Sequence, residues 1–347
     1  MKKLFLLIGL LLPSVIFAQI PLGYYDSAAG LTGTPLKNTL HDIISAGTIN
    51  IGYDGLWTAY PRTDKKANGK VWDMYSDIPG GTAPYEFTFV TNQCGNYNSE
   101  NDCYNREHSV PASWFSDASP MYSDLFHVVP TDGWVNNKRS NYPFGEVGTA
   151  SWTSLNGSKL GTSDFPGYTG TVFEPIDSFK GDFARIYFYM CVRYKDELPS
   201  WTGESFSGGN LTIWAENMFL QWNALDPVSQ KERDRNDSVY QIQHNRNPFV
   251  DNPEWIYAIW GPTAGTDEES AVNYFNVFPS PATNSVNLDF RSGTKPDEAY
   301  LFDLQGRKLL TFTGEQSFSV EDLPSGFYVV KCIFSNIASE KALIVTH

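Results

Sequence analysis

A chain of 347 residues is long enough for two domains, and 15% aromatic against 18% charged residues disfavours an intrinsically disordered protein. The formal net charge of −14 disfavours long-range attraction of a polyanion, so a nucleic-acid site would depend on a bound cation or a few arginines. We expect a folded, two-domain monomer.

The N-terminus has the pattern of a secretory signal peptide over residues 1–18. Lys2 and Lys3 precede an apolar run from Leu4 to Phe17, and the small Ala18 follows. A transmembrane anchor is the alternative, but the run is shorter than the ~20 residues that a bilayer span needs. No later segment is apolar enough to span a membrane, so we expect an exported chain without a stable membrane span.

The cysteines fit an oxidising compartment. Cys94 and Cys103 bracket a polar loop and are the plausible disulfide pair, with two free thiols as the alternative. Cys191 lies in an apolar helical pattern and Cys332 lies far along the chain, so we expect both to be unpaired and buried.

Residues 19–262 form the predicted body of the protein. Apolar residues at helical spacing predict helices over 39–51, 179–194 and 213–226. Pro227 ends the third of these, and another helix is predicted over 229–246. The stretches between them are rich in Gly, Pro, Asn and Ser, which predicts long connecting loops.

A hairpin and a helix are predicted in the middle of this body. Residues 107–110 and 125–129 favour strands, and Thr131 or Asp132 is positioned to cap a helix that runs to about Asn141. The helix would end there because Tyr142 is followed by Pro143.

Four polar residues of this segment are expected to meet. Asn136 and Arg139 are three apart on one helix face, which would turn toward the strand carrying Glu107 and His108. A carboxylate and an amide oxygen suit a hard divalent cation, a neutral imidazole suits activation of a water, and a guanidinium suits phosphate oxygens. The set therefore favours phosphodiester hydrolysis.

Two alternatives compete with this interpretation. Glu107 and His108 form a purely structural pair in one of them, and His108 is a metal ligand in the other. Zinc is disfavoured because the five histidines are scattered and the sequence has no His-x-x-x-His or Cys-x-x-Cys pair.

Other polar and aromatic residues have structural interpretations. Asp182 and Arg185 favour a surface ion pair, and the turn around Asn247 is expected to bury Phe249. Burial in the core is favoured over base stacking for four tryptophans near the motifs, Trp57, Trp72, Trp114 and Trp134.

Residues 103–115 and 124–145, together with 71–77, 180–190 and 245–253, resemble the bacterial endonuclease I and extracellular ribonuclease family. These are nonspecific nucleases built on a ββα-metal (His-Me) finger, and the resemblance spans roughly residues 25–260. It implies an α+β fold, with a mainly helical catalytic domain around the finger. It also implies that His108 activates the attacking water and that Glu107 and Asn136 hold one Mg²⁺, with Ca²⁺ or Mn²⁺ as possible replacements. The substrate would be DNA, RNA or both.

The sequence departs from the family pattern at two points. Phe126 stands where relatives usually have a histidine, and no arginine lies between His108 and Asp124, where relatives often place a phosphate-binding one. Arg139 is the expected catalytic substitute, with Arg106 or Arg185 as alternatives. Arg139 could equally hold the finger together by pairing with a neighbouring acid. Asp124 and His127 are expected to be supporting or structural groups. The competing function is a catalytically dead, secreted nucleic-acid-binding or adhesion protein.

A linker over 263–272 leads to a C-terminal module, residues 273–347, predicted as a small all-β sandwich. Its expected strands are 286–290, 298–303, 308–312, 317–320, 326–333 and 341–345. Residues 276–281, 299–307 and 323–330 resemble the type IX secretion sorting domain of Bacteroidetes. This implies recognition by outer-membrane secretion machinery and a secreted or cell-surface protein. A carbohydrate-binding sandwich is the alternative, but the module shows no cluster of aromatics suited to it.

Overall fold

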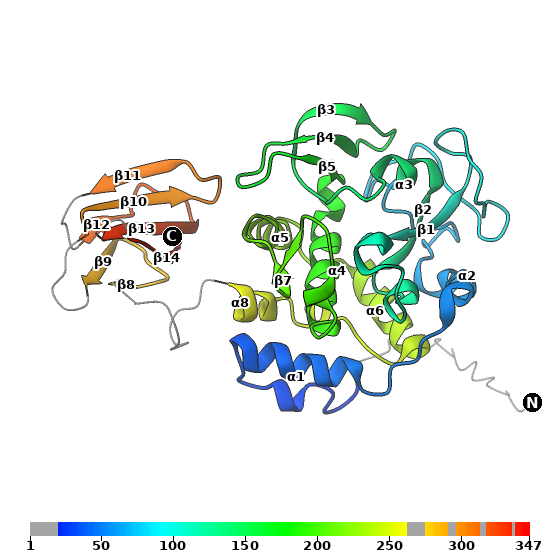
Figure 1. Cartoon of the computed structure of the whole chain (residues 1–347), viewed down its shortest axis with the longest axis horizontal. Coiled ribbons are helices and arrows are strands. Elements are labelled where there is room, and N and C mark those ends of the chain that lie inside the picture. Colours follow the sequence, from blue (N-terminus) through cyan, green and yellow to red (C-terminus); the bar gives the residue numbers. More distant parts are fainter. Residues whose placement is uncertain (1–19, 262–274, 291–295, 313–316, 335–336) are drawn as a thin grey trace, which may run out of the picture.

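The computed structural model describes residues 20–261, 275–290, 296–312, 317–334 and 337–347. An α+β body is followed by an all-β module (Figure 1), which confirms the predicted fold class. The expected signal peptide and the linker over 263–272 lie outside the described residues. Among the described helices, none is long and apolar enough to cross a membrane.

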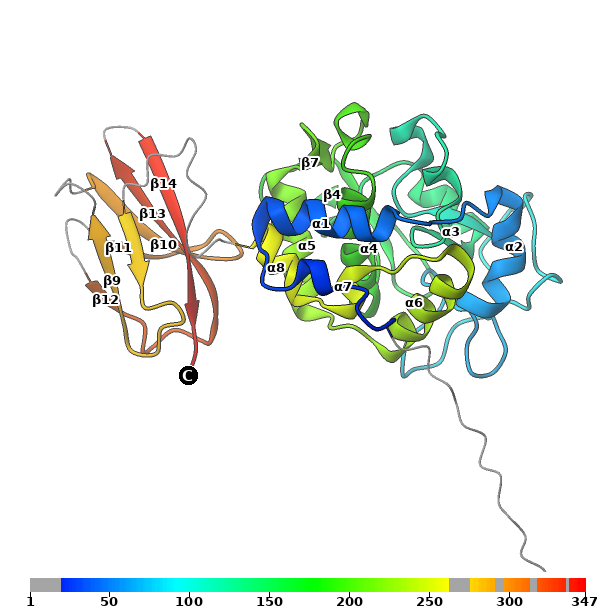
Figure 2. The ribbon, with the colours of Figure 1, turned by 90° about the horizontal axis from the view of Figure 1, so that it is seen from below.

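Helix α4 forms the centre of the body, because its side chains from Lys180 to Val192 are all buried. Helices α1, α5 and α7 pack against it, and Figure 2 shows α1 crossing the body beside it. The helices of the body are α1 Gly33–Ser45, α2 Gly52–Thr63, α3 Gly133–Arg139, α4 Lys180–Arg193, α5 Ile213–Leu225, α6 Gln230–Gln243, α7 Pro248–Asp251 and α8 Glu254–Trp260. Single 3-10 turns occur at η1 Asp26–Ala28, η2 Ala112–Phe115, η3 Met121–Ser123, η4 Asp177–Phe179 and η5 Leu198–Ser200.

The predicted positions of α4, α5 and α6 are confirmed to within a few residues. Helix α1 begins at Gly33 and not at residue 39, because Pro35 falls in the first turn, where its missing N–H costs no hydrogen bond. The chain leaves the helix at Ala46, and Gly47 then takes a positive φ of 69°. Helix α2 was not predicted, since two glycines and Pro61 lower its helix propensity.

The predicted hairpin and helix are present, with shifted strands. Strand β1 (Tyr104–His108) pairs antiparallel with β2 (Val128–Asp132), which places His108 opposite Val128, and α3 follows directly. The second strand begins later than predicted because the Asp124 carboxylate accepts the Phe126 N–H and holds residues 125–127 in a turn. Asp132 caps α3 by accepting the Val135 N–H at 2.9 Å, as expected.

Two small sheets occur where loops were predicted. The first has the order β3-β4-β5, formed by Val147–Thr153, Lys159–Ser163 and Thr171–Glu174, and the second pairs β6 (Phe206–Ser207) with β7 (Asn210–Leu211). Strand β3 is almost entirely solvent-exposed, so it carries no alternation of apolar and polar residues to reveal it.

The predicted disulfide between Cys94 and Cys103 is present, and Cys191 and Cys332 are free and buried, as expected. The closed loop packs on the start of α3. Its Asn101 N–H donates to Asp132 at 2.8 Å, and the Cys103 carbonyl accepts the Gly133 N–H at 2.9 Å. The disulfide loop therefore braces the junction between β2 and α3.

Replacing both bridged cysteines by serine is expected to lower the free energy of unfolding by about 2–3 kcal/mol, because the unfolded chain regains the entropy that a short closed loop lacks. Urea denaturation of the double variant beside the reduced and oxidised wild type measures this. An unchanged denaturation midpoint in the variant would contradict it. The reduced wild type is the matched control, because it opens the loop without changing a side chain.

The C-terminal module is the predicted two-sheet β structure. In the described residues its sheets have the orders β11-β10-β13-β14 and β12-β9-β8, with one buried apolar cluster. The strands are β8 Phe275–Phe278, β9 Ser285–Phe290, β10 Glu298–Asp303, β11 Lys308–Phe312, β12 Ser317–Ser319, β13 Gly326–Phe334 and β14 Ile337–Val345. Strand β8 was not predicted.

Candidate active site

The structure brings the four predicted polar residues to one open cleft of about 360 Å³ at the hairpin and α3. The cleft is lined by Arg106, Glu107, His108, Pro111, Ala112, Ser113, Asn136, Arg139, Ser140 and Asn141. Strand β1 supplies the first three, and α3 with the residues after it supplies the last four. The ββα arrangement therefore places its polar residues around one cavity.

The imidazole of His108 is held in one orientation. Its Nε2 lies 3.1 Å from the Tyr122 carbonyl, and its ring stacks on Tyr122 and Tyr53 at centroid distances of 4.8 and 5.8 Å. A carbonyl only accepts, so Nε2 carries the proton of the neutral ring and Nδ1 keeps a free lone pair. Burial, reinforced by His127, lowers the pKa of His108 to about 3, so the ring is neutral at pH 7.

Glu107 is almost completely buried, and one of its two carboxylate oxygens accepts hydrogen bonds from the protein. Its Oε1 accepts the Tyr75 hydroxyl at 2.8 Å and the Arg139 Nη1 at 2.7 Å. Burial raises the pKa of its carboxyl, and Arg139 and Tyr75 oppose that shift. The hydrogen bonds of Glu107 in the described part of the chain all use Oε1, which leaves Oε2 as an unshared acceptor at the cleft.

Asn136 presents its amide oxygen in a fixed direction. Its Nδ2 donates to the Asn105 side chain at 2.8 Å and approaches the Arg106 carbonyl at 3.4 Å. The amide oxygen then points away from both acceptors. Over the residues that the structure describes, no group of three or more His, Cys, Asp or Glu side chains could hold a metal. A cation here would depend on Glu107, Asn136 and water.

Arg139 lies beneath the cleft with a side chain only 1% exposed. Besides Glu107, its guanidinium donates to three main-chain carbonyls, those of His108 at 2.7 Å, Ser109 at 2.5 Å and Tyr142 at 3.1 Å. The predicted contact between Arg139 and phosphate stays a prediction. The hydrogen bonds of Arg139 within the protein disfavour it, because they leave few N–H groups of the guanidinium for a ligand.

Asp124 and His127 are structural groups, as expected. The Asp124 carboxylate accepts the hydroxyls of Tyr189 and Tyr194 at 2.8 and 2.6 Å. His127 is fully buried, and its Nε2 lies 2.6 Å from the Met121 carbonyl. Both sit behind the hairpin and outside the cleft lining.

The surface ion pair predicted between Asp182 and Arg185 is wrong. Both side chains are buried, 5% and 1% exposed, and their closest approach is 3.9 Å. Arg185 instead forms a bidentate pair with Glu232 of α6, with contacts of 2.6 and 2.8 Å. Helical spacing placed the two residues on one face correctly, but α6 covers that face. Arg185 does not line the cleft, which argues against a phosphate contact for it.

A family model described as Endonuclease I matches residues 32–254, well over half of the chain. This chain belongs to the endonuclease I family. The extracellular ribonuclease of Bacillus subtilis is 34% identical over 73% of this chain and 83% of that protein, and the Bacillus amyloliquefaciens one is 36% identical over 68% and 78%. A periplasmic deoxyribonuclease of Aeromonas hydrophila is 27% identical over 38% of this chain and 48% of its own length.

The C-terminal module matches a secretion system C-terminal sorting domain over residues 276–346. The predicted type of export is thereby confirmed: the chain is a type IX secretion substrate, secreted or displayed at the cell surface. The carbohydrate-binding alternative for this module is not needed.

The endonuclease I domain buries the aromatics near its motifs. Trp72 and Trp114 are buried, as expected, and Phe249 lies in the core on α7. Trp57 and Trp134 are half-buried and each lies under a cation, Arg106 at 4.6 Å and Lys138 at 4.7 Å. These two rings support charged side chains in the structure.

Three tyrosines of the site were missed from the sequence. Tyr53 on α2 and Tyr122 on η3 contact each other and the His108 ring, and the Tyr75 hydroxyl donates to Glu107. Tyr75 belongs to the block 71–77 of the family resemblance, which was the only signal available for it. Nothing local marks Tyr53, because α2 itself was not predicted.

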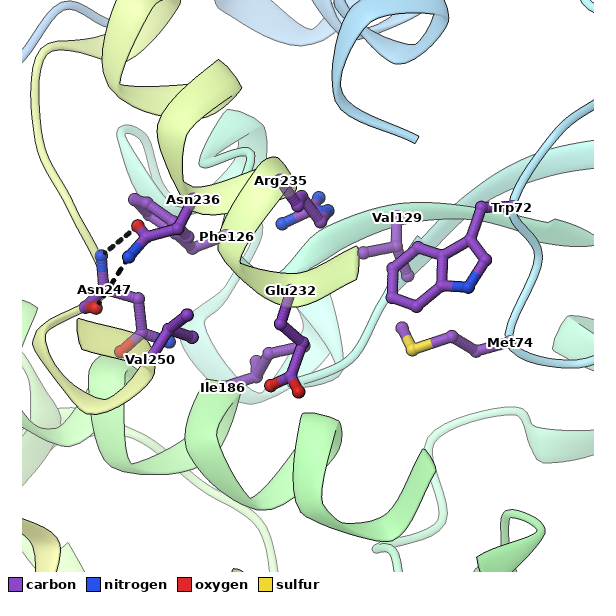
Figure 3. A pocket seen from close by; sticks show the side chains of 10 residues that line it. All are labelled: Trp72, Met74, Phe126, Val129, Ile186, Glu232, Arg235, Asn236, Asn247 and Val250. Atoms are coloured by element: carbon purple, nitrogen blue, oxygen red, sulfur yellow. Dashed lines mark hydrogen bonds between the residues drawn. The ribbon is translucent and has the colours of Figure 1, made fainter. Parts of the chain in front are cut away.

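A second, internal cavity of about 30 Å³ lies between α4, α6 and the β2 strand (Figure 3). It has room for a water molecule and not for a nucleotide. Phe126 lies on its wall, together with Ile186 of α4 and Glu232 of α6. The departure from the family at Phe126 thus falls at an interior packing position and outside the cleft.

Proposed function

We propose that the endonuclease I domain is a metal-dependent, nonspecific endonuclease that hydrolyses phosphodiester bonds in DNA, RNA or both. The observation that carries this is the neutral His108 ring, whose Nε2 is committed to the Tyr122 carbonyl in a cleft shared with Glu107 and Asn136. The domains proposed to act are the catalytic domain over 19–262 and the sorting domain over 273–347, in a monomer.

His108 is the proposed general base. Its free Nδ1 lone pair accepts a proton from a water in the cleft, and the resulting hydroxide attacks phosphorus as the bond from phosphorus to the departing ester oxygen breaks. The departing oxygen then takes a proton from solvent. The Tyr122 carbonyl stabilises the imidazolium that forms, because it remains hydrogen-bonded to Nε2. Stacking on two tyrosines keeps the ring in the plane that this hydrogen bond requires.

One divalent cation fits beside this base. Glu107 offers its free Oε2 and Asn136 its free amide oxygen, and Mg²⁺ characteristically takes one or two protein oxygens and several waters. Mn²⁺ or Ca²⁺ suits the same oxygen ligands. When bound, the cation neutralises charge on the phosphate and on the departing oxygen. Arg139 acts through Glu107, by holding its other oxygen and the end of β1 in place.

The test incubates the chain without residues 1–18 with supercoiled plasmid and with structured RNA, in Mg²⁺, Mn²⁺, Ca²⁺ and EDTA. We expect cleavage with a cation and none in EDTA. Both substrates are needed, since the Bacillus relatives are named ribonucleases and the Aeromonas one a deoxyribonuclease. Binding of either nucleic acid without cleavage under all conditions would favour a dead binding protein, and undiminished cleavage in EDTA would exclude the cation.

A further inference from the structure

We propose that Arg106 binds the non-bridging oxygens of the phosphate that the cleft receives, with Tyr53 and Trp57 holding its guanidinium in place. The proposal deepens the proposed nuclease function and rests on it. It assigns a contact with substrate to a side chain that is adjacent to Glu107 and whose guanidinium makes hydrogen bonds only through Nη1 in the described residues.

The acidic charge of the chain favours such a contact. The chain carries a net −14, and Arg106 and Arg139 are the cationic residues among those that line the cleft. Arg139 is buried and committed to Glu107 and to main-chain carbonyls. Arg106, with a side chain 15% exposed, is therefore the guanidinium of the cleft lining that a polyanion entering against the overall charge can reach.

The guanidinium of Arg106 is fixed on one side only. Its Cζ lies 3.4 Å above the Tyr53 ring and 4.6 Å from the Trp57 ring, and Nη1 donates to the Tyr53 carbonyl at 2.8 Å. Within the described chain, neither Nε nor Nη2 donates a hydrogen bond. These two atoms form one edge of the planar fork, which matches two phosphate oxygens.

Arg106 and His108 are placed to act on the same phosphate. Alternate residues of a strand point to one side and are spaced about 6–7 Å apart. The Tyr53 ring connects them, because it lies under Arg106 and also stacks on His108 at 5.8 Å. A phosphate held by the Arg106 fork therefore lies beside the water that Nδ1 of His108 would activate.

Asp54 is the competing anion at this position. Its carboxylate is 3.5 Å from Nη1 of Arg106, and its side chain is fully exposed. An exposed ion pair at this distance is weak and gives way to a phosphate. Removing the Asp54 charge should therefore tighten nucleic-acid binding.

The experiment measures binding of a fluorescent single-stranded oligonucleotide in EDTA, where the proposed cleavage is absent, across a range of KCl concentrations. The variants are Arg106→Gln, Arg106→Lys and Asp54→Asn, each in the chain without residues 1–18. Arg233→Gln is the matched control, because Arg233 is exposed on α6 and does not line the cleft. Thermal unfolding of each variant is recorded alongside.

We expect Arg106→Gln to weaken binding roughly tenfold and to lower the slope of log K against log salt by about 0.7, the value for one lost single-strand phosphate contact. Arg106→Lys should keep the slope and lose part of the affinity, and Asp54→Asn should bind roughly 1.5- to 5-fold more tightly.

An Arg106→Gln variant with the same affinity and salt slope as Arg233→Gln would overturn the proposal, even if its melting temperature falls. If the proposed function is wrong, the wild type binds the oligonucleotide but cleaves nucleic acid with none of the cations. The difference in binding between Arg106→Gln and Arg233→Gln still decides the role of Arg106 in that case. A wild type that binds no nucleic acid overturns both proposals.

Discussion

The His108→Ala variant is expected to cleave about 10²–10⁴-fold more slowly than the wild type, because no other described group of the cleft is a neutral base with a free lone pair. Initial rates on plasmid and on RNA in Mg²⁺ measure this. The fold should survive, since the side chain makes one hydrogen bond, to the Tyr122 carbonyl, and is only partly buried at the edge of the cleft.

Added imidazole separates a chemical role of His108 from a structural one. The truncated side chain leaves space beside the Tyr53 and Tyr122 rings, and free imidazole bound there should restore part of the cleavage. His244→Asn is the matched control, since His244 is exposed in a left-handed conformation that asparagine tolerates. Normal cleavage by His108→Ala, or a loss that imidazole never rescues, would sink the general-base assignment.

The sequence allowed prediction of those parts of the fold whose signals are local. Apolar periodicity located α4 and α5, and the break at Pro227 marked the start of α6. The capping side chain of Asp132 with the Tyr142-Pro143 stop located α3. The spacing of Asn136 and Arg139 on α3 correctly turned both residues toward β1. These features depend on residues within a few positions of one another, which is why the sequence alone reveals them.

The contacts that position the site are long-range, and the sequence did not reveal them. Glu107 receives its hydrogen bond from Tyr75, 32 residues earlier, and Arg106 receives its aromatic support from α2, over 50 residues earlier. The interpretation of Arg139 shows the same limit. Helical spacing predicted that Arg139 faces the site. Only the packing of β1 against α3 determines that its side chain lies beneath the cleft.

The Arg139→Met variant is expected to lose about 3–5 kcal/mol of stability, because it leaves the Glu107 carboxylate buried without its charge partner. It also strips a donor from three main-chain carbonyls. Cleavage should fall with it, since Glu107 and the end of β1 lose the anchor that orients them. Urea denaturation and the cleavage rate of the folded fraction measure the two effects separately.

Arg185→Met provides a matched control, because Arg185 is equally buried and bonds Glu232 as closely as Arg139 bonds Glu107. It should lose comparable stability and yet keep the cleavage rate of its folded molecules, since it does not line the cleft. Adding Glu107→Gln to Arg139→Met should recover roughly 1–3 kcal/mol, because the unpaired charge is removed. Equal cleavage rates for the two arginine variants, per folded molecule, would mean that Arg139 stabilises the fold and does not position the site.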